Sequence, residues 1–333
     1  MKIQISDYTD KILEEEDLSS EELNNISENA DTESLLKSAN YIRKVMKGSQ
    51  ADLCAAINIK SGRCSEDCRY CSQSGFYNTH TKIYDMVDYE KVWEFAEHSR
   101  INGIRNLGLS SSGGALSQLD KEKLLSIYQK LSSRSEINLC GAHGILKDEE
   151  EARQLKEAGL DTYEHNLQTS KRYYPNICTT HSYEERINTI KFAINAGLKV
   201  CSGGIIGLGE NMTDRIDMAI LLRDLGVLSV PINILNPVPG TPCGDKPIPL
   251  TKEEALRSMA IFRLALPKAN LIYGAGRNFM GTDQSQAFSA GLNGIVVGNF
   301  LTIQGNSIAE DIALLKEQGL EPSPDFNKMM ARN

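Results

Sequence analysis

The sequence has few cysteines, no excess of positive charge and no long apolar run. Only eight of its 333 residues are cysteine, too few for disulfides to organise a chain of this length. The net charge is −8, and no basic stripe indicates a nucleic-acid surface. No apolar run approaches the ~20 residues of a membrane span, and the first residues lack the apolar segment of a signal peptide. We therefore expect a soluble cytoplasmic protein that binds neither nucleic acid nor membrane.

Three cysteines lie close together, as Cys64, Cys68 and Cys71 of the segment GRCSEDCRYC. This CxxxCxxC spacing allows three thiolates of one loop to bind a [4Fe–4S] cluster and to leave its fourth iron without a protein ligand. Structural zinc is the alternative, but it usually takes a fourth ligand from a second CxxC-type pair, and none follows within the next thirty residues. The loop resembles that of radical S-adenosylmethionine (SAM) enzymes, including Tyr70 before the last cysteine. That resemblance implies that the open iron binds SAM and that Tyr70 belongs to the cofactor site.

The remainder of the chain alternates helical patterns with short apolar runs. Ala-Gly-Leu recurs at residues 158–160, 196–198 and 290–292, each time where a helical pattern ends and an apolar run begins. Glycine commonly ends a helix, and the run that follows is typical of a buried parallel strand. Helical stretches such as 183–196 and 253–266 separate these runs. The expected strands lie near residues 53–58, 104–109, 137–141, 162–166, 199–206, 227–235, 270–273 and 294–298.

Eight strands over about 250 residues predict an α/β fold, a (β/α)8 TIM-type barrel. A doubly wound open sheet is the alternative, but it would have one phosphate loop at a reversal of strand order, whereas polar motifs here follow many strands. We expect a helical extension over residues 1–50, the barrel over 51–305, and a last helix near 308–319 with a tail within 306–333. The first strand leads into the cysteine loop, which places the cluster at the barrel mouth.

Turns rich in small residues follow two other strands. The segment CSGGIIGLGE (201–210) follows the fifth strand, and its glycines allow the backbone to approach a flat ligand closely. The segment SSSGG (110–114) follows the second strand. Taken alone, each of these two segments is typical of an ordinary turn. The resemblance to radical SAM enzymes implies that both segments contact SAM. The positions are Gly203, Ile205 and Gly207 for the adenine, and Ser110 and Ser111 for the methionine amino group.

Four segments resemble biotin synthases in their order and separation. They are YEHNLQTS (163–170), TTHSYEER (179–186), CSGGIIGLGE (201–210) and SVPINIL (229–235), the last followed by GTP at 240–242. The resemblance extends from about residue 52 to residue 319. It implies an enzyme that inserts sulfur between two unactivated carbons of dethiobiotin to give biotin. It also implies a homodimer and an electron donor, flavodoxin or ferredoxin.

The same resemblance implies roles for four polar residues. Arg186 would pair with the SAM carboxylate through its planar fork of donors. Asn166 would lie between the SAM ribose and the ureido ring of dethiobiotin, and Asn233 would bind that ureido group with its donor and acceptor. Gln168 replaces a common aspartate and would bind the ribose more weakly. Without the resemblance, an asparagine at a strand end is often a helix cap, and an arginine on a helix is usually solvated.

The chain departs from the better known biotin synthases at the sulfur source. Those enzymes hold an auxiliary [2Fe–2S] cluster with three strand cysteines and an arginine, and only Cys140 and Cys201 match here. The second-strand cysteine aligns with Leu107 and the arginine with Ile272. Two ligands do not suffice for that cluster, so either the sulfur source differs or other residues bind it.

Cys54 is the best candidate for a further auxiliary ligand. Strand alternation puts Cys54, Ala56 and Asn58 on one face, and Cys54 lies about 13 Å below Asn58 at ~3.3 Å per residue, too deep to bind the first cluster. Cys54, Cys140 and Cys201 would hold a [4Fe–4S] cube with one open iron. Our hypothesis is that this iron carries an extra, transferable sulfide, a [4Fe–5S] species, as resemblance to a variant type of biotin synthase in anaerobes implies.

Three other potential ligands remain. Cys178 and Cys243 lie in loops, where we expect packed or exposed thiols, and His143 has the opposite strand parity to Cys140. The resemblance implies that one electron enters the first cluster and cleaves SAM to a 5′-deoxyadenosyl radical, which takes hydrogen from dethiobiotin before sulfur is inserted. The alternatives are another radical SAM enzyme of the hydrogenase-maturation or pyrrolysine-pathway type, and a non-catalytic metal-binding module.

Overall fold

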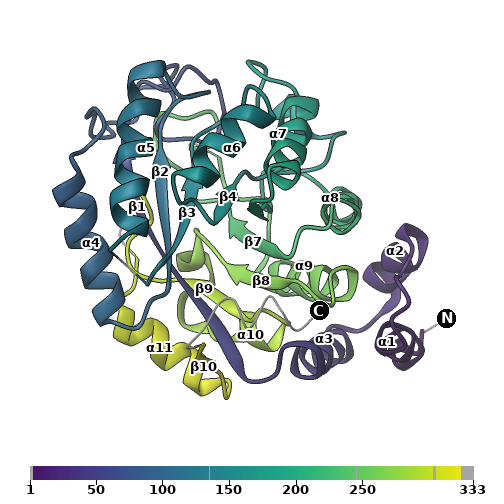
Figure 1. Ribbon diagram of the computed structural model, residues 1–333. Coiled ribbons are helices and arrows are strands. Elements are labelled where there is room, and N and C mark those ends of the chain that lie inside the picture. The colour runs from purple at the N-terminus through teal and green to yellow at the C-terminus, as the bar shows by residue number, and fades with distance from the viewer. Residues whose placement is uncertain (1–2, 135, 245, 303–304, 324–333) are drawn as a thin grey trace.

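A closed barrel of parallel strands forms the centre of the computed structural model, which describes residues 3–134, 136–244, 246–302 and 305–323 (Figure 1). β1 (Gln50–Lys60) pairs with β2 (Asn106–Ser111) on one side and with β9 (Gly294–Val296) on the other, which closes the sheet. The remaining barrel strands are β3 (Asn138–Ala142), β4 (Thr162–Glu164), β5 (Lys199–Cys201), β6 (Gly204–Ile206), β7 (Ser229–Ile234) and β8 (Asn270–Tyr273). All of their pairings are parallel. The predicted (β/α)8 barrel is confirmed.

The fifth barrel strand is broken in two. We expect one strand over residues 199–206, but β5 and β6 are separate, and both pair with β7. At the break, a Cβ on Gly203 would lie 1.9 Å from the carbonyl oxygen of Pro231, so only glycine fits there. The freed backbone bonds to the loop after β4 instead: Gln168 N–H donates to the Gly203 carbonyl (3.0 Å), and Ile205 N–H donates to the Gln168 carbonyl (2.8 Å). The break therefore ties the β4 loop to the glycine-rich turn.

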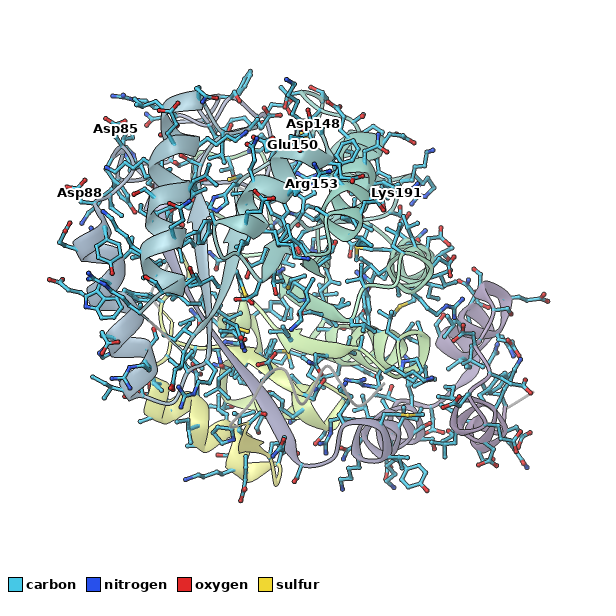
Figure 2. The ribbon with its side chains drawn as sticks, in the orientation of Figure 1. Asp85, Asp88, Asp148, Glu150, Arg153 and Lys191 are labelled. Carbon is cyan, nitrogen blue, oxygen red and sulfur yellow. The ribbon has the colours of Figure 1, made fainter. Side chains whose placement is uncertain are left out.

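An outer layer of helices surrounds the barrel (Figure 1). Figure 2 shows charged side chains of this layer, such as Glu150, Arg153 and Lys191, pointing away from the strands. The helices with their 3-10 turns are α4 (Tyr89–Ile101), α5 (Gln118–Ser132), α6 (Glu149–Glu157), η1 (Tyr174–Asn176), α7 (Tyr183–Asn195), α8 (Met212–Asp224), α9 (Lys252–Ala265), η2 (Arg277–Asp283), α10 (Gln286–Ser289) and α11 (Ile308–Glu317). Capping boxes set the first residues of α7, α8 and α11, where Ser182, Asn211 and Ser307 accept from the N3 backbone. Apolar residues of each helix then face the strands, so that the core lies between the two layers.

Three helices precede the barrel, α1 (Ile5–Leu13), α2 (Ser20–Asn29) and α3 (Thr32–Lys47). They lie at the lower right of Figure 1, where α2 and α3 pack on α9 and α2 also contacts α8. Leu35 and Ile42 of α3 are fully buried. A helical segment therefore precedes β1, and it covers the barrel at the end where β1 begins.

The end of the described chain packs on the barrel through a buried ion pair. Arg277, after β8, donates to Asp311 of α11 through both guanidinium nitrogens, at 2.6 and 3.0 Å. β10 (Glu321–Pro322) then pairs with the start of β1. The tail that we expect at the C-terminus lies, from residue 324 onward, outside the described residues. Among the described segments, no helix combines the length and apolarity needed to cross a membrane.

Candidate active site at the barrel mouth

A cavity of about 470 Å³ opens at the carboxyl ends of the barrel strands. Its wall combines the cysteine loop that follows β1 with two deeper cysteines, Cys54 on β1 and Cys201 on β5. Most of the other predicted site residues also line it, namely Tyr70, Ser110, Ser111, Asn166, Gln168, Arg186, Ile205 and Asn233. Gly203, Gly207 and Cys140 are not part of this lining. The structure therefore gathers residues from all of the barrel strands and from their loops around one space.

Backbone hydrogen bonds fix the cysteine loop. Cys64 N–H donates to the Gln73 carbonyl (3.0 Å), and Gly75 N–H donates to the Cys64 carbonyl (2.8 Å). All of the cysteines are free, and the sulfur atoms of Cys64, Cys68 and Cys71 do not all lie within 4.8 Å of one another. A tetrahedral zinc ion would hold its thiolates ~3.8 Å apart, given its bond length of about 2.3 Å. These three thiols therefore do not form a single-ion site by themselves, although Cys68 lies within 4.8 Å of ligand atoms of Cys178 and His181.

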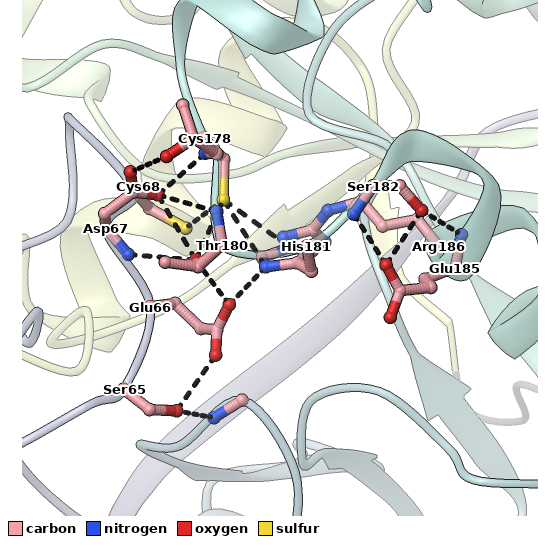
Figure 3. Close-up of polar contacts among 12 residues, drawn as sticks. Ser65, Glu66, Asp67, Cys68, Cys178, Thr180, His181, Ser182, Glu185 and Arg186 are labelled. Atoms are coloured by element: carbon pink, nitrogen blue, oxygen red, sulfur yellow. Dashed lines mark hydrogen bonds and ion pairs between the residues drawn. The ribbon is translucent and has the colours of Figure 1, made fainter.

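A second thiol lies against this loop. The Cys68 Sγ is 3.7 Å from the Cys178 Sγ, which is 3.4 Å from the Nδ1 of His181 (Figure 3). Glu66 contacts His181 and accepts a hydrogen bond from the Thr180 hydroxyl (2.6 Å). Contact with Cys68, helped by His181, lowers the pKa of Cys178 to about 4. Cys178 is a packed thiol, but its contact with Cys68 was not apparent from the sequence, because 110 residues separate the two.

Arg186 is a buried cation on α7 that faces the cavity. Its Nε donates to the Tyr174 hydroxyl (2.6 Å), and its Nη1 donates to the carbonyl oxygen of Asn166 (2.7 Å). No carboxylate in the described part of the chain forms an ion pair with it. Because a buried charge requires a partner, this guanidinium is suited to an anionic ligand in the cavity.

The amide side chains at the mouth already bond to the backbone. The Oδ1 of Asn166 accepts from Gly203 N–H (2.9 Å). Asn233 accepts from Ala275 N–H at 2.8 Å and donates to the Gly204 carbonyl at 3.1 Å. For a ligand, Asn166 keeps both N–H donors and one lone pair, and Asn233 keeps one N–H donor and one lone pair. The buried Oε1 of Gln168 has no hydrogen-bond partner among the described residues, so it is free to accept one.

His143 is held away from the cavity by two neighbours. Its Nδ1 lies 2.9 Å from the Ser111 hydroxyl, and its Nε2 lies 2.7 Å from the Tyr128 hydroxyl. Burial lowers the pKa of His143 to about 3. A neutral ring with both nitrogens bonded orients Ser111 rather than binding iron.

Three thiols lie deeper in the barrel, on β1, β3 and β5, of which Cys140 and Cys201 are buried and Cys54 is half-buried. Burial raises the pKa of Cys54, Cys140 and Cys201 above the ordinary thiol value, and nearby thiols add to the effect on Cys54 and Cys140. Their sulfur atoms are not all within 4.8 Å of one another. The thiols would therefore stay protonated unless a metal bound them, and their spread suits a cluster rather than a single ion.

Comparisons with known proteins identify the family. Residues 58–222 match the radical SAM superfamily, and residues 231–321 match the Biotin and Thiamin Synthesis associated domain. A biotin synthase of Acetivibrio thermocellus is 45% identical over 289 residues, 87% of this chain and 90% of the relative. A biotin synthase of Clostridium tetani is 45% identical over 323 residues, 96% of this chain and 99% of the relative. The chain belongs to the biotin synthase family.

Solved structures support the barrel of this biotin synthase family member. Methylornithine synthase matches with a TM-score of 0.84 at 18% identity, covering 97% of this chain and 99% of that one. A hydrogenase maturase of Carboxydothermus hydrogenoformans matches with a TM-score of 0.82 at 19% identity, covering 98% and 81%. These identities show the fold alone, so neither alternative activity is supported, whereas biotin synthase family membership means an enzyme with a [4Fe–4S] cluster and SAM.

The strand register shows which β2 residue lies on the side of the auxiliary thiols. Leu107 is fully buried and pairs in register with Ala55 and Leu139. Gly108 is the β2 residue that pairs with Cys140. Because directly paired residues of neighbouring strands face the same side, Gly108 rather than Leu107 lies next to the auxiliary thiols. Ile272 lines the cavity instead of being only a core residue.

Glu66, Glu164 and His165 are among the cavity residues that the sequence-based interpretation missed. Glu164 had the clearest signal, because it lies two positions before Asn166 in the strand expected over 162–166, and alternation gives both one face. Cys243, by contrast, is half-buried, and its N–H donates to the Arg69 carbonyl (3.2 Å).

Proposed function

We propose that this protein converts dethiobiotin to biotin by radical insertion of sulfur. The observation that carries the proposal is the shared cavity, in which a three-cysteine loop and deeper strand cysteines surround one space. When bound, the [4Fe–4S] cluster and SAM supply the radical that removes hydrogen, and an auxiliary cluster supplies the sulfur. The chain's own residues bind these groups, orient the substrate and exclude water.

SAM would bind between the cysteine loop and α7. Cys64, Cys68 and Cys71 would hold the first cluster, and Arg186 would receive the SAM carboxylate because it is a buried cation without an acidic partner. The remaining contacts would come from the predicted set of Tyr70, Ser110, Ser111, Asn166, Gln168, Gly203, Ile205 and Gly207. Gly203 and Gly207 would contribute close backbone approach rather than side-chain contact.

Dethiobiotin would lie deeper, between SAM and the strand cysteines. Its cyclic urea offers two N–H donors and one carbonyl acceptor. Asn166 keeps two donors and one lone pair unused, and Asn233 keeps one of each. Backbone bonds hold the Asn233 amide in place at the break between β5 and β6. That rigidity supports a role in orienting the ureido ring relative to the radical.

The auxiliary cluster would be held by Cys54, Cys140 and Cys201. Ile272 and the Leu107–Gly108 segment offer no metal ligand, so the arginine-containing [2Fe–2S] site lacks two of its four ligands. Three thiols on alternate strands support a four-iron cube with an open iron, and a [4Fe–5S] form would make its extra sulfide the transferred atom. We further propose flavodoxin or ferredoxin as the electron donor and a cytoplasmic homodimer as the working form.

A direct assay tests the function. Anaerobically purified protein is mixed with SAM, dithionite and dethiobiotin, and the products are analysed by mass spectrometry. We expect 5′-deoxyadenosine and biotin from the native chain and neither from the Cys68→Ala variant. Formation of 5′-deoxyadenosine without biotin would reject sulfur insertion and leave a radical SAM enzyme of another specificity.

A further inference from the structure

Glu164 places a carboxylate among the strand cysteines. It is the last residue of β4 and pairs in register with Cys201 of β5. A Cβ built on Gly108 would lie 3.2 Å from the Glu164 Oε1 and 3.5 Å from its Oε2. Gly108 in turn pairs with Cys140 of β3. The carboxylate therefore fills the space that Gly108 leaves open, on the same side of the sheet as Cys140.

This carboxylate has no protein partner. Within the described ranges, no group forms a hydrogen bond or an ion pair with the Glu164 carboxylate, which is half-buried and lines the cavity. Two buried acids elsewhere in the fold are paired instead, Asp311 with Arg277 and Glu210 with Arg215 at 2.7 Å. The Glu164 oxygens therefore stay available to a cation that enters the cavity.

We propose that Glu164 is a ligand of the auxiliary cluster, binding the iron that Cys54, Cys140 and Cys201 leave open. Carboxylates are ordinary ligands of iron in proteins, and iron would supply a positive charge. Glu164 would then occupy this iron whenever the extra sulfide is absent. Binding of the carboxylate in place of a sulfide ion changes no oxidation state. The inference rests on the proposed function, since it assumes the auxiliary cluster.

The position of Glu164 favours iron over substrate as its partner. Asn166 and Asn233 line the mouth with unused amide groups, whereas Glu164 lies over Gly108, beside the pairs formed by Cys140 and Cys201. A hydrogen bond from the dethiobiotin urea to Glu164 is the competing role. It would alter substrate affinity without altering the cluster, so the two roles give different readouts.

The test compares the native chain with Glu164→Gln, which keeps the shape but removes the anionic ligand. Glu66→Gln is the matched control, because Glu66 lines the same cavity but bonds to Thr180 and His181. The proteins are reconstituted anaerobically without excess sulfide, and SAM is added to occupy the first cluster. Iron content, EPR spectra and iron release to a ferrous chelator are then measured.

We expect Glu164→Gln to lose about one iron per chain and, after one electron is removed with ferricyanide, to give the EPR signal of an oxidised three-iron cluster. That iron should reach the chelator about tenfold faster than in the native chain or the control. Glu164→Asp, whose carboxylate is set back by one methylene, should show the same loss in weaker form, which separates lost ligation from misfolding.

Each contrary result has its own meaning. Native-like spectra and iron release in Glu164→Gln would overturn the assignment. A raised KM for dethiobiotin with an unchanged cluster would overturn it too, in favour of a substrate contact. If the native chain itself contains only the first cluster, the auxiliary part of the proposed function fails, and this inference fails with it.

Discussion

The sulfur atom of Cys178 lies 3.7 Å from the sulfur atom of Cys68, although the two cysteines come from different loops. Cys178 follows η1 and also contacts His181. Without iron, Cys68 donates to Cys178 and lowers the pKa of the Cys178 thiol. Once iron binds Cys68 as a thiolate, that donor is lost, and Cys178 then carries the proton and donates it to the iron-bound sulfur. Hydrogen bonds to cluster sulfurs are among the factors that set the reduction potential.

The first prediction concerns this thiol. Cys178→Val removes the donor, so the reduced and more negative cluster loses a stabilising contact. We expect the midpoint potential of the first cluster to fall by roughly 60 mV, a tenfold change in the reduction equilibrium. Cys178→Ser, which keeps a donor, should change it less. An EPR-monitored redox titration measures the shift, and equal midpoints for the native chain and the valine variant would contradict it.

The second prediction concerns the buried guanidinium. Arg186→Gln removes the charge that would pair with the SAM carboxylate, and such a charged hydrogen bond contributes about 1.5 to 3 kcal/mol. We expect SAM binding to weaken roughly tenfold to a hundredfold while the visible spectrum of the cluster stays unchanged. Equilibrium binding of SAM under anaerobic conditions measures the affinity.

Lys191 supplies the control for this variant. It lies on the same helix, α7, and points into solvent (Figure 2). Lys191→Gln also removes one positive charge, but it should leave SAM affinity unchanged. Equal losses in the two variants would mean that Arg186 acts through net charge alone and not through a contact in the cavity.

Local patterns were enough to predict the strands and the lining of the mouth. Each strand has its own apolar run, and parallel strands end at one edge, which places Asn166 and Asn233 at the mouth. Their roles in binding were implied only by the resemblance to biotin synthases.

Local patterns do not predict contacts that depend on how neighbouring strands pack. The break at Gly203 comes from the approach of Pro231, a residue of the neighbouring strand. The position of Gly108 beside Cys140 depends on the register between β2 and β3. A shift of one residue in that register would turn the other face of the strand toward the thiols.

The third prediction concerns the auxiliary ligands. Cys54→Ala should remove the second cluster and lower the iron content from about eight to about four per chain, while the first cluster keeps its EPR signal with SAM. Cys243→Ala is the matched control, because Cys243 is also a partly exposed free thiol in a loop near the mouth. Iron and sulfide analysis decides the outcome. Near six irons in the native chain would indicate a two-iron auxiliary cluster instead.

The fourth prediction concerns pH and His143. Burial lowers its pKa to about 3, below the value of about 6.5 for an exposed histidine. Between these values the unfolded chain binds the proton and the folded chain does not, so His143 contributes stability that is full above pH 6.5 and is lost as the pH falls. Each pH unit in this window corresponds to ~1.4 kcal/mol of unfolding free energy.

A variant separates the pH-dependent stability due to His143 from that due to other buried titratable groups. The raised pKa of Asp52, about 7 because of burial, gives a slope of opposite sign, but it is common to both chains and cancels in a difference. His143→Gln keeps partners for Ser111 and Tyr128 without titrating. We therefore expect the stability advantage of the native chain over His143→Gln to shrink by about 2 kcal/mol between pH 7 and pH 5. Chemical denaturation of the cluster-free proteins measures it, and parallel stability curves would show that His143 becomes protonated within the fold.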